Sequence, residues 1–154
     1  MPVDPIPEGY PRVIPALIVA GAADAIDFYV AVLGATERMR MAGPDGTVAH
    51  AELVIGDSVI MLGDEQPGTD MPSPRTVGGS PVSLHVYVED VDAVFDRAVQ
   101  AGARVLEAVA DQFYGDRSGR FEDPFGHRWG VASHVEDVSE EEMARRAAEW
   151  TPGG

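Results

Sequence analysis

Apolar and polar positions along this chain change their period from one segment to the next, and the same series of periods occurs twice. The mostly apolar run Arg12–Ala20 predicts a strand. The apolar residues of Asp24–Ala35 recur at helical spacing up to Gly34, a residue type that suits a helix C-terminus. The first half therefore predicts the order β-α-β-β-β. Its three further strands are expected at Ala35–Met41, Thr47–Ile55 and Ser58–Leu62.

The same order returns in the second half. Val82–Val88 predicts a strand. The helix predicted at Asp92–Ala103 aligns with the first helix without gaps, so that Gly102 matches Gly34. Self-similarity at a fixed offset indicates a duplicated structural unit. The remaining strands of this half are expected at Arg104–Val109, Ser118–Asp123 and His127–Ser133.

The repeat defines the expected domain organisation. Two βαβββ modules cover residues 12–63 and 82–134, and a linker rich in Pro, Gly, Ser and Thr joins them at 64–81. A tail at 135–154 contains a capping box and one short amphipathic helix. Because each module carries its helix on one face of a curved sheet, the other face needs cover. We therefore expect an α+β fold in which the two modules form a curved mixed sheet around a cleft.

Composition narrows the classes of function. The 154 residues carry a formal net charge of -15 and the basic residues are scattered, so nucleic-acid binding is not expected. The chain has no cysteine, which excludes disulfides, thiolate metal sites and a cysteine nucleophile. No apolar run is long enough to span a membrane, and the N-terminus has no signal-peptide pattern. We expect no membrane partner and a cytoplasmic location.

Five segments of the chain have a distinctive order and spacing: Asp24–Tyr29, Leu33–Ala35, His50–Leu53, Gly56–Leu62 and Glu122–His127. They resemble the vicinal oxygen chelate superfamily, which includes glyoxalase I, bleomycin-binding proteins, fosfomycin-resistance enzymes and extradiol dioxygenases. The resemblance covers about residues 12–134, is closest to the PhnB-like group, and implies the two-module fold. It also implies a homodimer, with the modules paired within one chain or exchanged between chains.

Relatives that catalyse reactions typically hold one divalent metal in the cleft, through His, Gln or Glu side chains on the first and last strands of the modules. Nitrogen and oxygen donors of this kind suit hard or borderline metals. Apart from serine, a weak ligand, none of the side chains at the corresponding positions here can bind a metal, so we expect no metal cofactor. The resemblance places those positions at Ile14 or Pro15, Ile60 or Met61, Ser83 and Gly130.

Strand alternation gives a separate prediction of what faces the cleft. Side chains two residues apart share a face, so Ser83, His85 and Tyr87 lie opposite the apolar positions of their strand. His50 and Glu52 share the polar face of another strand by the same argument. The complete predicted ligand pocket is His50, Glu52, Met61, Ser83, His85, Tyr87, Phe113, Tyr114, Arg117, Arg128 and Gly130.

Two of these features have alternative interpretations. His85 is either a cavity histidine paired with a carboxylate or Tyr87, or a catalytic general base or off-register metal ligand acting with His50, Glu52 or Glu122. The segment Asp111–Arg120 is either a flap or a plain loop. In a flap, Phe113 or Tyr114 would stack on a ligand and Arg117 would bind a carboxylate or other anion; in a plain loop, Arg117 would pair with Asp111 or Asp116 and Phe113 would fill the module interface.

These observations lead to three hypotheses of function. We expect a metal-independent protein that binds a small aromatic or anionic ligand in the cleft, rather than an enzyme. The alternative is a glyoxalase-like lyase or isomerase that uses His85 with Arg117 or a displaced metal site. The third hypothesis is a structural or regulatory dimer module whose cavity is filled by side chains.

Overall fold

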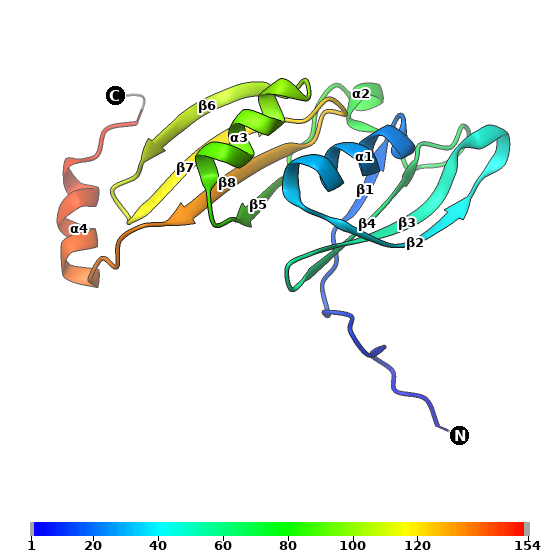
Figure 1. Ribbon diagram of the computed structural model, residues 1–154, viewed down its shortest axis with the longest axis horizontal. Coiled ribbons are helices and arrows are strands. Elements are labelled where there is room, and N and C mark those ends of the chain that lie inside the picture. The colour runs from blue at the N-terminus through cyan, green and yellow to red at the C-terminus, as the bar shows by residue number, and fades with distance from the viewer. Residues whose placement is uncertain (1, 153–154) are drawn as a thin grey trace. The chain divides into compact units, whose positions relative to one another are not determined.

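The computed structural model describes residues 2–152 and divides into an N-terminal unit, residues 1–80, and a C-terminal unit, residues 81–154. Each unit contains one βαβββ repeat with its own four-stranded mixed sheet (Figure 1). The structure thus confirms the predicted α+β class and the duplication. The cleft between the two modules stays a prediction.

In the N-terminal unit the sheet has the order β1-β4-β3-β2, with β1 parallel to β4 and the other pairs antiparallel. Helix α1 (Ala22–Leu33) buries a stripe of apolar side chains that includes Ile26 and Tyr29, and these form the core with the strands. The strands are β1 (Ala16–Val19), β2 (Thr36–Ala42), β3 (Val48–Ile55) and β4 (Ser58–Asp64), with a short 3-10 helix η1 (Pro44–Gly46) between β2 and β3.

The N-terminus of α1 is held by a carboxylate from a distant strand. Asp64 accepts the backbone N–H groups of Gly21 (2.9 Å), Ala22 (2.8 Å) and Val48 (2.8 Å). A negative charge at this end also favours the helix dipole. Desolvation opposes ionisation of Asp64, but the three hydrogen bonds together lower its pKa below the ordinary value. Strand β4 therefore continues to Asp64, which the sequence pattern assigned to the linker.

The rest of the predicted linker is folded rather than featureless. It contains the short helix α2 (Pro74–Val77), capped by Ser73, which is fully buried. Glu65 accepts hydrogen bonds from the backbone and hydroxyl of Ser73 and from the hydroxyl of Thr76 (2.8–3.0 Å). These contacts bind the segment to itself without any periodic apolar pattern, which explains why periodicity did not reveal them.

The C-terminal unit has the corresponding sheet order β5-β8-β7-β6, with β5 parallel to β8. Helix α3 (Val91–Gln100) covers one face, where Phe95 contacts Phe121 edge-on at 6.0 Å. The opposite face carries polar side chains. The strands are β5 (Ser83–Tyr87), β6 (Arg104–Asp111), β7 (Asp116–Glu122) and β8 (Arg128–His134), and helix α4 (Glu140–Glu149) follows them.

Two predicted strand boundaries differ in the structure, and the second difference affects the site. Strand β1 begins at Ala16, since Pro15 has no N–H to donate to a ladder. Strands β6 and β7 extend further toward each other than predicted, so the expected flap at 111–120 is reduced to the four-residue turn 112–115 between paired strands. Among the described residues, no helix is both long and apolar enough to cross a membrane.

Candidate functional site

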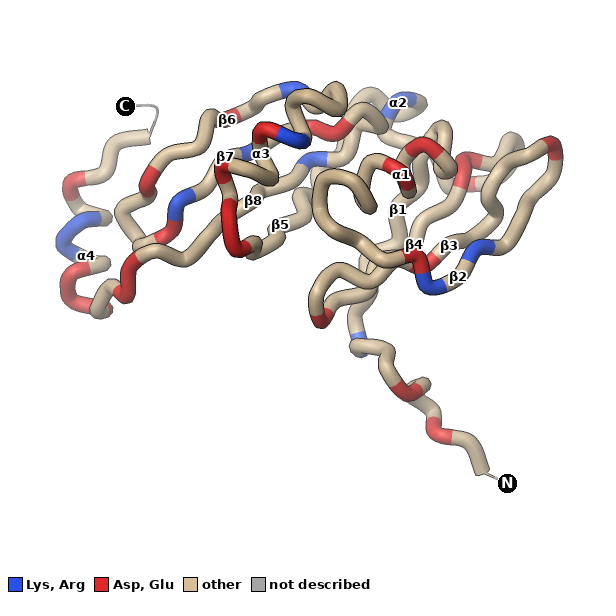
Figure 2. The backbone as a smooth tube through the Cα atoms, viewed as in Figure 1, with Lys and Arg blue, Asp and Glu red and all other residues tan. Residues whose placement is uncertain are grey.

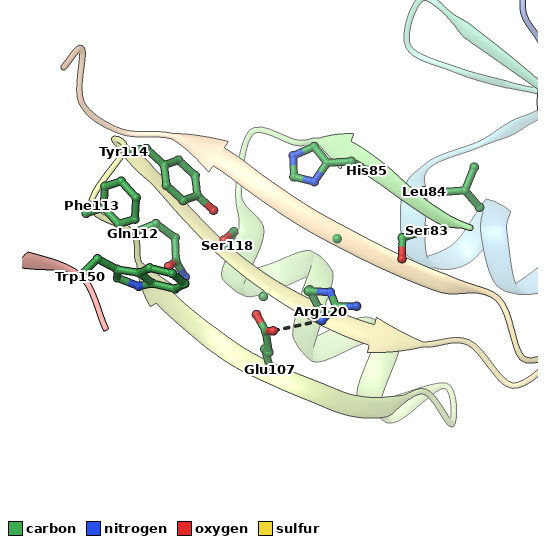
Figure 3. A pocket seen from close by; sticks show the side chains of 12 residues that line it. Ser83, Leu84, His85, Glu107, Gln112, Phe113, Tyr114, Ser118, Arg120 and Trp150 are labelled. Carbon is green, nitrogen blue, oxygen red and sulfur yellow. Dashed lines mark hydrogen bonds and ion pairs between the residues drawn. The ribbon is translucent and has the colours of Figure 1, made fainter. Parts of the chain in front are cut away.

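The polar face of the C-terminal sheet bounds a cavity of about 260 Å³ (Figure 3). Strands β5, β6, β7 and β8 supply most of its wall, and the 112–115 turn and the residue after α4 supply the rest. The wall has a polar part, which includes Ser83, His85, Glu107, Ser118 and Arg120, and an aromatic part near the turn. Every residue of this wall belongs to the C-terminal unit.

His85 is the central side chain of the polar part. It lies opposite Gly130 in the β5–β8 ladder, and a Cβ atom at Gly130 would come within 2.8 Å of the His85 Nδ1 atom. The glycine therefore leaves the room that the imidazole occupies. The ring contacts Tyr87 edge-on at 5.0 Å. Within residues 2–152 neither ring nitrogen of His85 makes a hydrogen bond, so both are available to a bound molecule.

Arg120 extends from β7 on the same side of the sheet. Its Nη1 atom bonds Glu107 Oε1 at 3.0 Å, a pair that Figure 3 marks on the cavity wall. Both side chains are partly exposed, so solvent screens the pair and it adds little stability. The Nε and Nη2 groups of Arg120 have no partner in the described chain. A guanidinium with free N–H groups suits a carboxylate or another planar acceptor.

The aromatic part of the wall is built on the β6–β7 turn. Phe113 and Tyr114 lie within the turn with ring centroids 5.2 Å apart, and Trp150 lies 5.8 Å from Phe113 (Figure 3). Trp150 follows α4 and is half exposed. Aromatic rings in these positions can pack against the face or the edge of a planar ligand.

A hydrogen-bonded chain of polar side chains adjoins the cavity through Tyr87. The Tyr87 hydroxyl donates to Asp116 Oδ2 (2.7 Å), and this bond raises the tyrosine pKa. His134 Nδ1 lies 2.8 Å from Asp116 Oδ1, and its Nε2 lies 2.8 Å from Asp137 Oδ1. Desolvation opposes the charge on buried Asp116, but the bonds from His134 and Tyr87 outweigh it and lower the pKa.

Both ring nitrogens of His134 therefore face carboxylate oxygens. A neutral imidazole has one N–H, so both contacts are hydrogen bonds only when the ring is protonated. The bond to Asp116, followed by the bond to Asp137, raises the pKa of His134 above its ordinary value. His134 therefore binds its proton more tightly than a free imidazole does, and it connects β8 to the segment that leads into α4.

In the N-terminal unit the predicted pocket residues form a self-contained cluster. Glu52 is only 5% exposed and accepts a hydrogen bond from the Tyr10 hydroxyl (2.6 Å), while His50 Nε2 lies 2.9 Å from its other oxygen. Arg38 lies 3.4 Å from Glu52 and stacks on the Tyr10 ring at 4.1 Å. The Tyr10 bond, then the His50 bond, lowers the pKa of Glu52. This carboxylate is already fully engaged.

The structure brings five of the predicted pocket residues together: Ser83, His85, Phe113, Tyr114 and Gly130. Tyr87 contacts His85 from outside the cavity wall, and Arg128 pairs with Glu122 at 3.3 Å. His50, Glu52 and the half-buried Met61 belong to the N-terminal unit.

Arg117 lies on the other face of β7 from the cavity. Its guanidinium bonds both oxygens of Asp92 on α3 (2.8 and 2.9 Å) and Asp111 at 3.2 Å, so the pairing with Asp111 considered as an alternative does occur. Alternation along β7 separates Arg117 from Ser118 and Arg120, which line the cavity. The cavity arginine is therefore Arg120, in place of the predicted Arg117.

Sequence reasoning missed several wall residues, among them Ser118, Arg120, Glu107 and Trp150. Alternation would have found Ser118 and Arg120 once the turn had been placed at 112–115. Trp150 follows a helix outside the repeat, and no pattern in the sequence connects it to the cavity.

The residues at the four ligand positions implied by the resemblance do not fit a divalent metal. Gly130 has no side chain, and the His85 ring fills the space beside it. Pro15 or Ile14 and Met61 or Ile60 offer no nitrogen or oxygen donor. Within residues 2–152 no group of three or more His, Cys, Asp or Glu side chains is placed to hold a metal ion elsewhere.

The fold and the site define a class: a duplicated βαβββ protein with a small cavity on the helix-free face of its second repeat. The profile of the Glyoxalase/Bleomycin resistance protein/Dioxygenase superfamily matches residues 13–131, and the chain belongs to this superfamily. This finding confirms the resemblance to the vicinal oxygen chelate proteins. A relative of Mycobacterium tuberculosis strain H37Rv, the uncharacterized protein Rv0887c, is 46% identical over 136 residues, which are 86% of this chain and 80% of the relative.

Solved structures give the same result for the fold. TioX from Micromonospora sp. ML1 is 27% identical and superposes with a TM-score of 0.61, over 81% of this chain and 99% of TioX. The PhnB protein from Bacillus cereus superposes with a TM-score of 0.64 at 19% identity, over 80% of this chain and 99% of that protein. At that identity the likeness to PhnB shows the fold alone.

Proposed function

We propose that this protein binds a small planar aromatic molecule carrying a carboxylate or a similar acceptor group, and that it does so without a metal ion. The observation that carries the proposal is the divided wall of the cavity, with unpartnered polar groups on one part and aromatic rings on the other. Ligand sites commonly combine an apolar wall with a few convergent polar groups in this way.

The aromatic part supports a flat ligand. The Phe113 ring contacts Tyr114 edge-on and Trp150 at a tilt, so a planar ligand ring can extend the same arrangement. Aromatic pairs contribute about 0.5–1.5 kcal/mol beyond the area they bury. A cavity of about 260 Å³ limits the ligand to one or two fused rings.

The polar part supports a single negative charge on the ligand. Arg120 has N–H groups without a partner in the described chain, and His85, two strands away on the same wall, can donate or accept a hydrogen bond. The net charge of -15 repels anions at long range, so an anionic ligand has to be attracted by Arg120 at contact distance. That distance is shorter than the Debye length of about 8 Å, so salt screens this attraction little. This balance disfavours polyanions such as nucleotides.

Free His85 also supports a second candidate, a lyase or isomerase that moves a proton on the bound ligand. An imidazole that has no hydrogen-bond partner in the described chain, and that lines the same cavity as a guanidinium two strands away, can act as a general base on a bound ligand. We rank binding first because His85 lacks the carboxylate partner that would fix its tautomer.

The test uses a matched pair of probes, quinoline-2-carboxylate and quinoline-2-carboxamide, titrated into the protein by calorimetry. A hydrogen bond to a charged group is worth about 1.5–3 kcal/mol, so we expect the carboxylate to bind at least tenfold more tightly than the amide. Replacement Arg120→Gln is expected to remove that preference. The control Arg104→Gln is expected to keep it, because Arg104 pairs with Glu122 away from the cavity wall.

Two results would overturn the proposal. One is the absence of binding by both probes to correctly folded wild-type protein, together with no binding by other bicyclic aromatic acids. The other is binding that Arg120→Gln and His85→Ala leave unchanged while thermal unfolding shows both variants to be folded. Turnover of a bound probe that disappears in His85→Ala would instead favour the enzyme.

A further inference from the structure

We propose that helix α4 is a lid on the cavity, that Arg146 is its latch, and that closure brings Trp150 against the aromatic ring of the ligand. The inference rests on the proposed function for its ligand, although the lid itself can be tested without one. Figure 1 shows α4 beside the ends of β6 and β7, and Figure 3 shows Trp150 next to Phe113 at one end of the cavity.

Helix α4 is attached to its unit by few contacts. None of its residues is buried, although it is amphipathic. Its arginines lie between acidic residues of the same helix (Figure 2). Ser139 caps it, accepting the N–H of Glu142 at 3.2 Å, and Arg145 bonds Glu142 and Glu149. These local interactions stabilise the helix itself and do not attach it to the sheet.

Attachment to the sheet depends on Arg146. Its guanidinium donates to the carbonyl oxygen of Phe113 (3.1 Å) in the β6–β7 turn and to both carboxylate oxygens of Glu136 (2.8 and 3.0 Å). Partly exposed ion pairs of this kind are weak individually. The second contact is the tilted packing of Trp150 on Phe113. Met143 is half-buried, and no residue of α4 is fully buried. A helix with so few anchoring contacts can open reversibly.

The segment before α4 provides a hinge. Val135 and Glu136 donate their backbone N–H groups to the carbonyl oxygen of Gly115 (2.9 and 3.0 Å), which fixes that part of the chain to the turn. Asp137, immediately after it, is exposed, and its side chain contacts His134 Nε2 at 2.8 Å. An exposed ion pair of this kind adds little stability. Motion of α4 would therefore pivot between Glu136 and the Ser139 cap, would break this pair, and would carry Trp150 away while the turn stays in place.

Arg146 and Arg145 form a matched pair for the test. Both bond Glu142 within the helix, but only Arg146 reaches Phe113 and Glu136. In stopped-flow measurements with quinoline-2-carboxylate, we expect Arg146→Gln to raise both the association and the dissociation rate at least threefold, because an open lid exposes entry and exit alike. Arg145→Gln is expected to leave both rates within twofold of wild type.

A measurement without ligand tests the lid separately. Trp129 is buried and bonded to Asp123, so changes in acrylamide quenching of tryptophan fluorescence report on Trp150. Quenching should increase in Arg146→Gln, and in 0.5 M NaCl, which screens the ion pair. It should not increase in Arg145→Gln. Equal quenching and equal rates in the two variants would overturn the lid while leaving the binding function intact. An unchanged association rate with faster dissociation would identify α4 as a fixed wall and would also overturn it. Failure of the probe to bind wild type would count against the binding function alone.

Discussion

At the scale of single residues, the site depends on which polar atoms already have partners. Glu52 and Asp116 are buried carboxylates whose oxygens are occupied by neighbouring side chains, whereas His85 and part of Arg120 are unoccupied. Groups of the first kind stabilise the unit in which they lie, and groups of the second kind are available to a ligand. His134 also has partners on both ring nitrogens, and the strength of these contacts depends on whether the ring is protonated.

We predict that the stabilising effect of His134 decreases as the pH rises. Its folded pKa lies above the unfolded value of about 6.5, so its contribution is complete below that pH and is lost as the pH rises through the folded pKa. Urea unfolding of wild type and His134→Gln between pH 5.5 and 9 should give a stability difference that shrinks with pH.

Two neighbouring groups of the same hydrogen-bonded chain titrate outside this range. Asp116, whose pKa is lowered, titrates below it, and Tyr87, whose pKa is raised, titrates above it. A stability difference that stays constant, or that grows toward pH 9, would contradict the raised pKa of His134.

At the scale of elements, the sequence predicted the repeat well and the turns poorly. Helical periodicity placed α1 and α3, and self-similarity supported the strands, because these patterns depend only on which side chains are apolar. The length of the β6–β7 turn depends instead on backbone geometry at Gly115 and on the packing of residues 135–136 against it. Because the turn was predicted too long, Arg117 was assigned to a flap over the cavity; it lies instead within β7, on the opposite face from Arg120.

The turn gives a prediction about stability. Gly115 has φ of 99°, and a Cβ atom there would collide with the carbonyl oxygen of Glu136, whereas Gly56 has φ of 57° and open space around it. We expect Gly56→Ala to cost about 1 kcal/mol from the left-handed backbone alone, and Gly115→Ala to cost roughly 2–4 kcal/mol because overpacking is added.

Urea unfolding at neutral pH measures both costs, with circular dichroism as the check that each variant folds. Equal costs for Gly115→Ala and Gly56→Ala would mean that residues 135–136 yield readily to the added methyl group, and would remove the fixed side of the proposed hinge.

At the scale of the whole molecule, the two units have diverged in chemistry while keeping one topology. In the N-terminal cluster both carboxylate oxygens of Glu52 have hydrogen-bond partners, and the C-terminal face has a cavity. Duplication was visible in the sequence because both units need the same apolar pattern to fold. The location of the cavity could not be predicted from the sequence, because it depends on Gly130, the β6–β7 turn and a tryptophan outside the repeat. The homodimer stays a prediction.

The absence of suitable ligands at the four positions gives the third prediction. A metal present at a hundred times its dissociation constant would stabilise the fold by about 2.7 kcal/mol and raise Tm by several degrees. We expect 1 mM Mn²⁺ or Ni²⁺ to change Tm by no more than the same concentration of Mg²⁺, which controls for screening of the net charge of -15. A larger shift that disappears in His85→Ala would establish a metal site and refute this expectation.

The alternation along β5 and β7 has a consequence for how such a protein can change over evolution or in the laboratory. Alternate positions of the same strand have different roles: the side chains on the helix side contribute to folding, and those on the cavity side contact a bound molecule. A library that varies Ser83, Ser118 and Arg120 while leaving their neighbours untouched should therefore yield mostly folded proteins with altered selectivity.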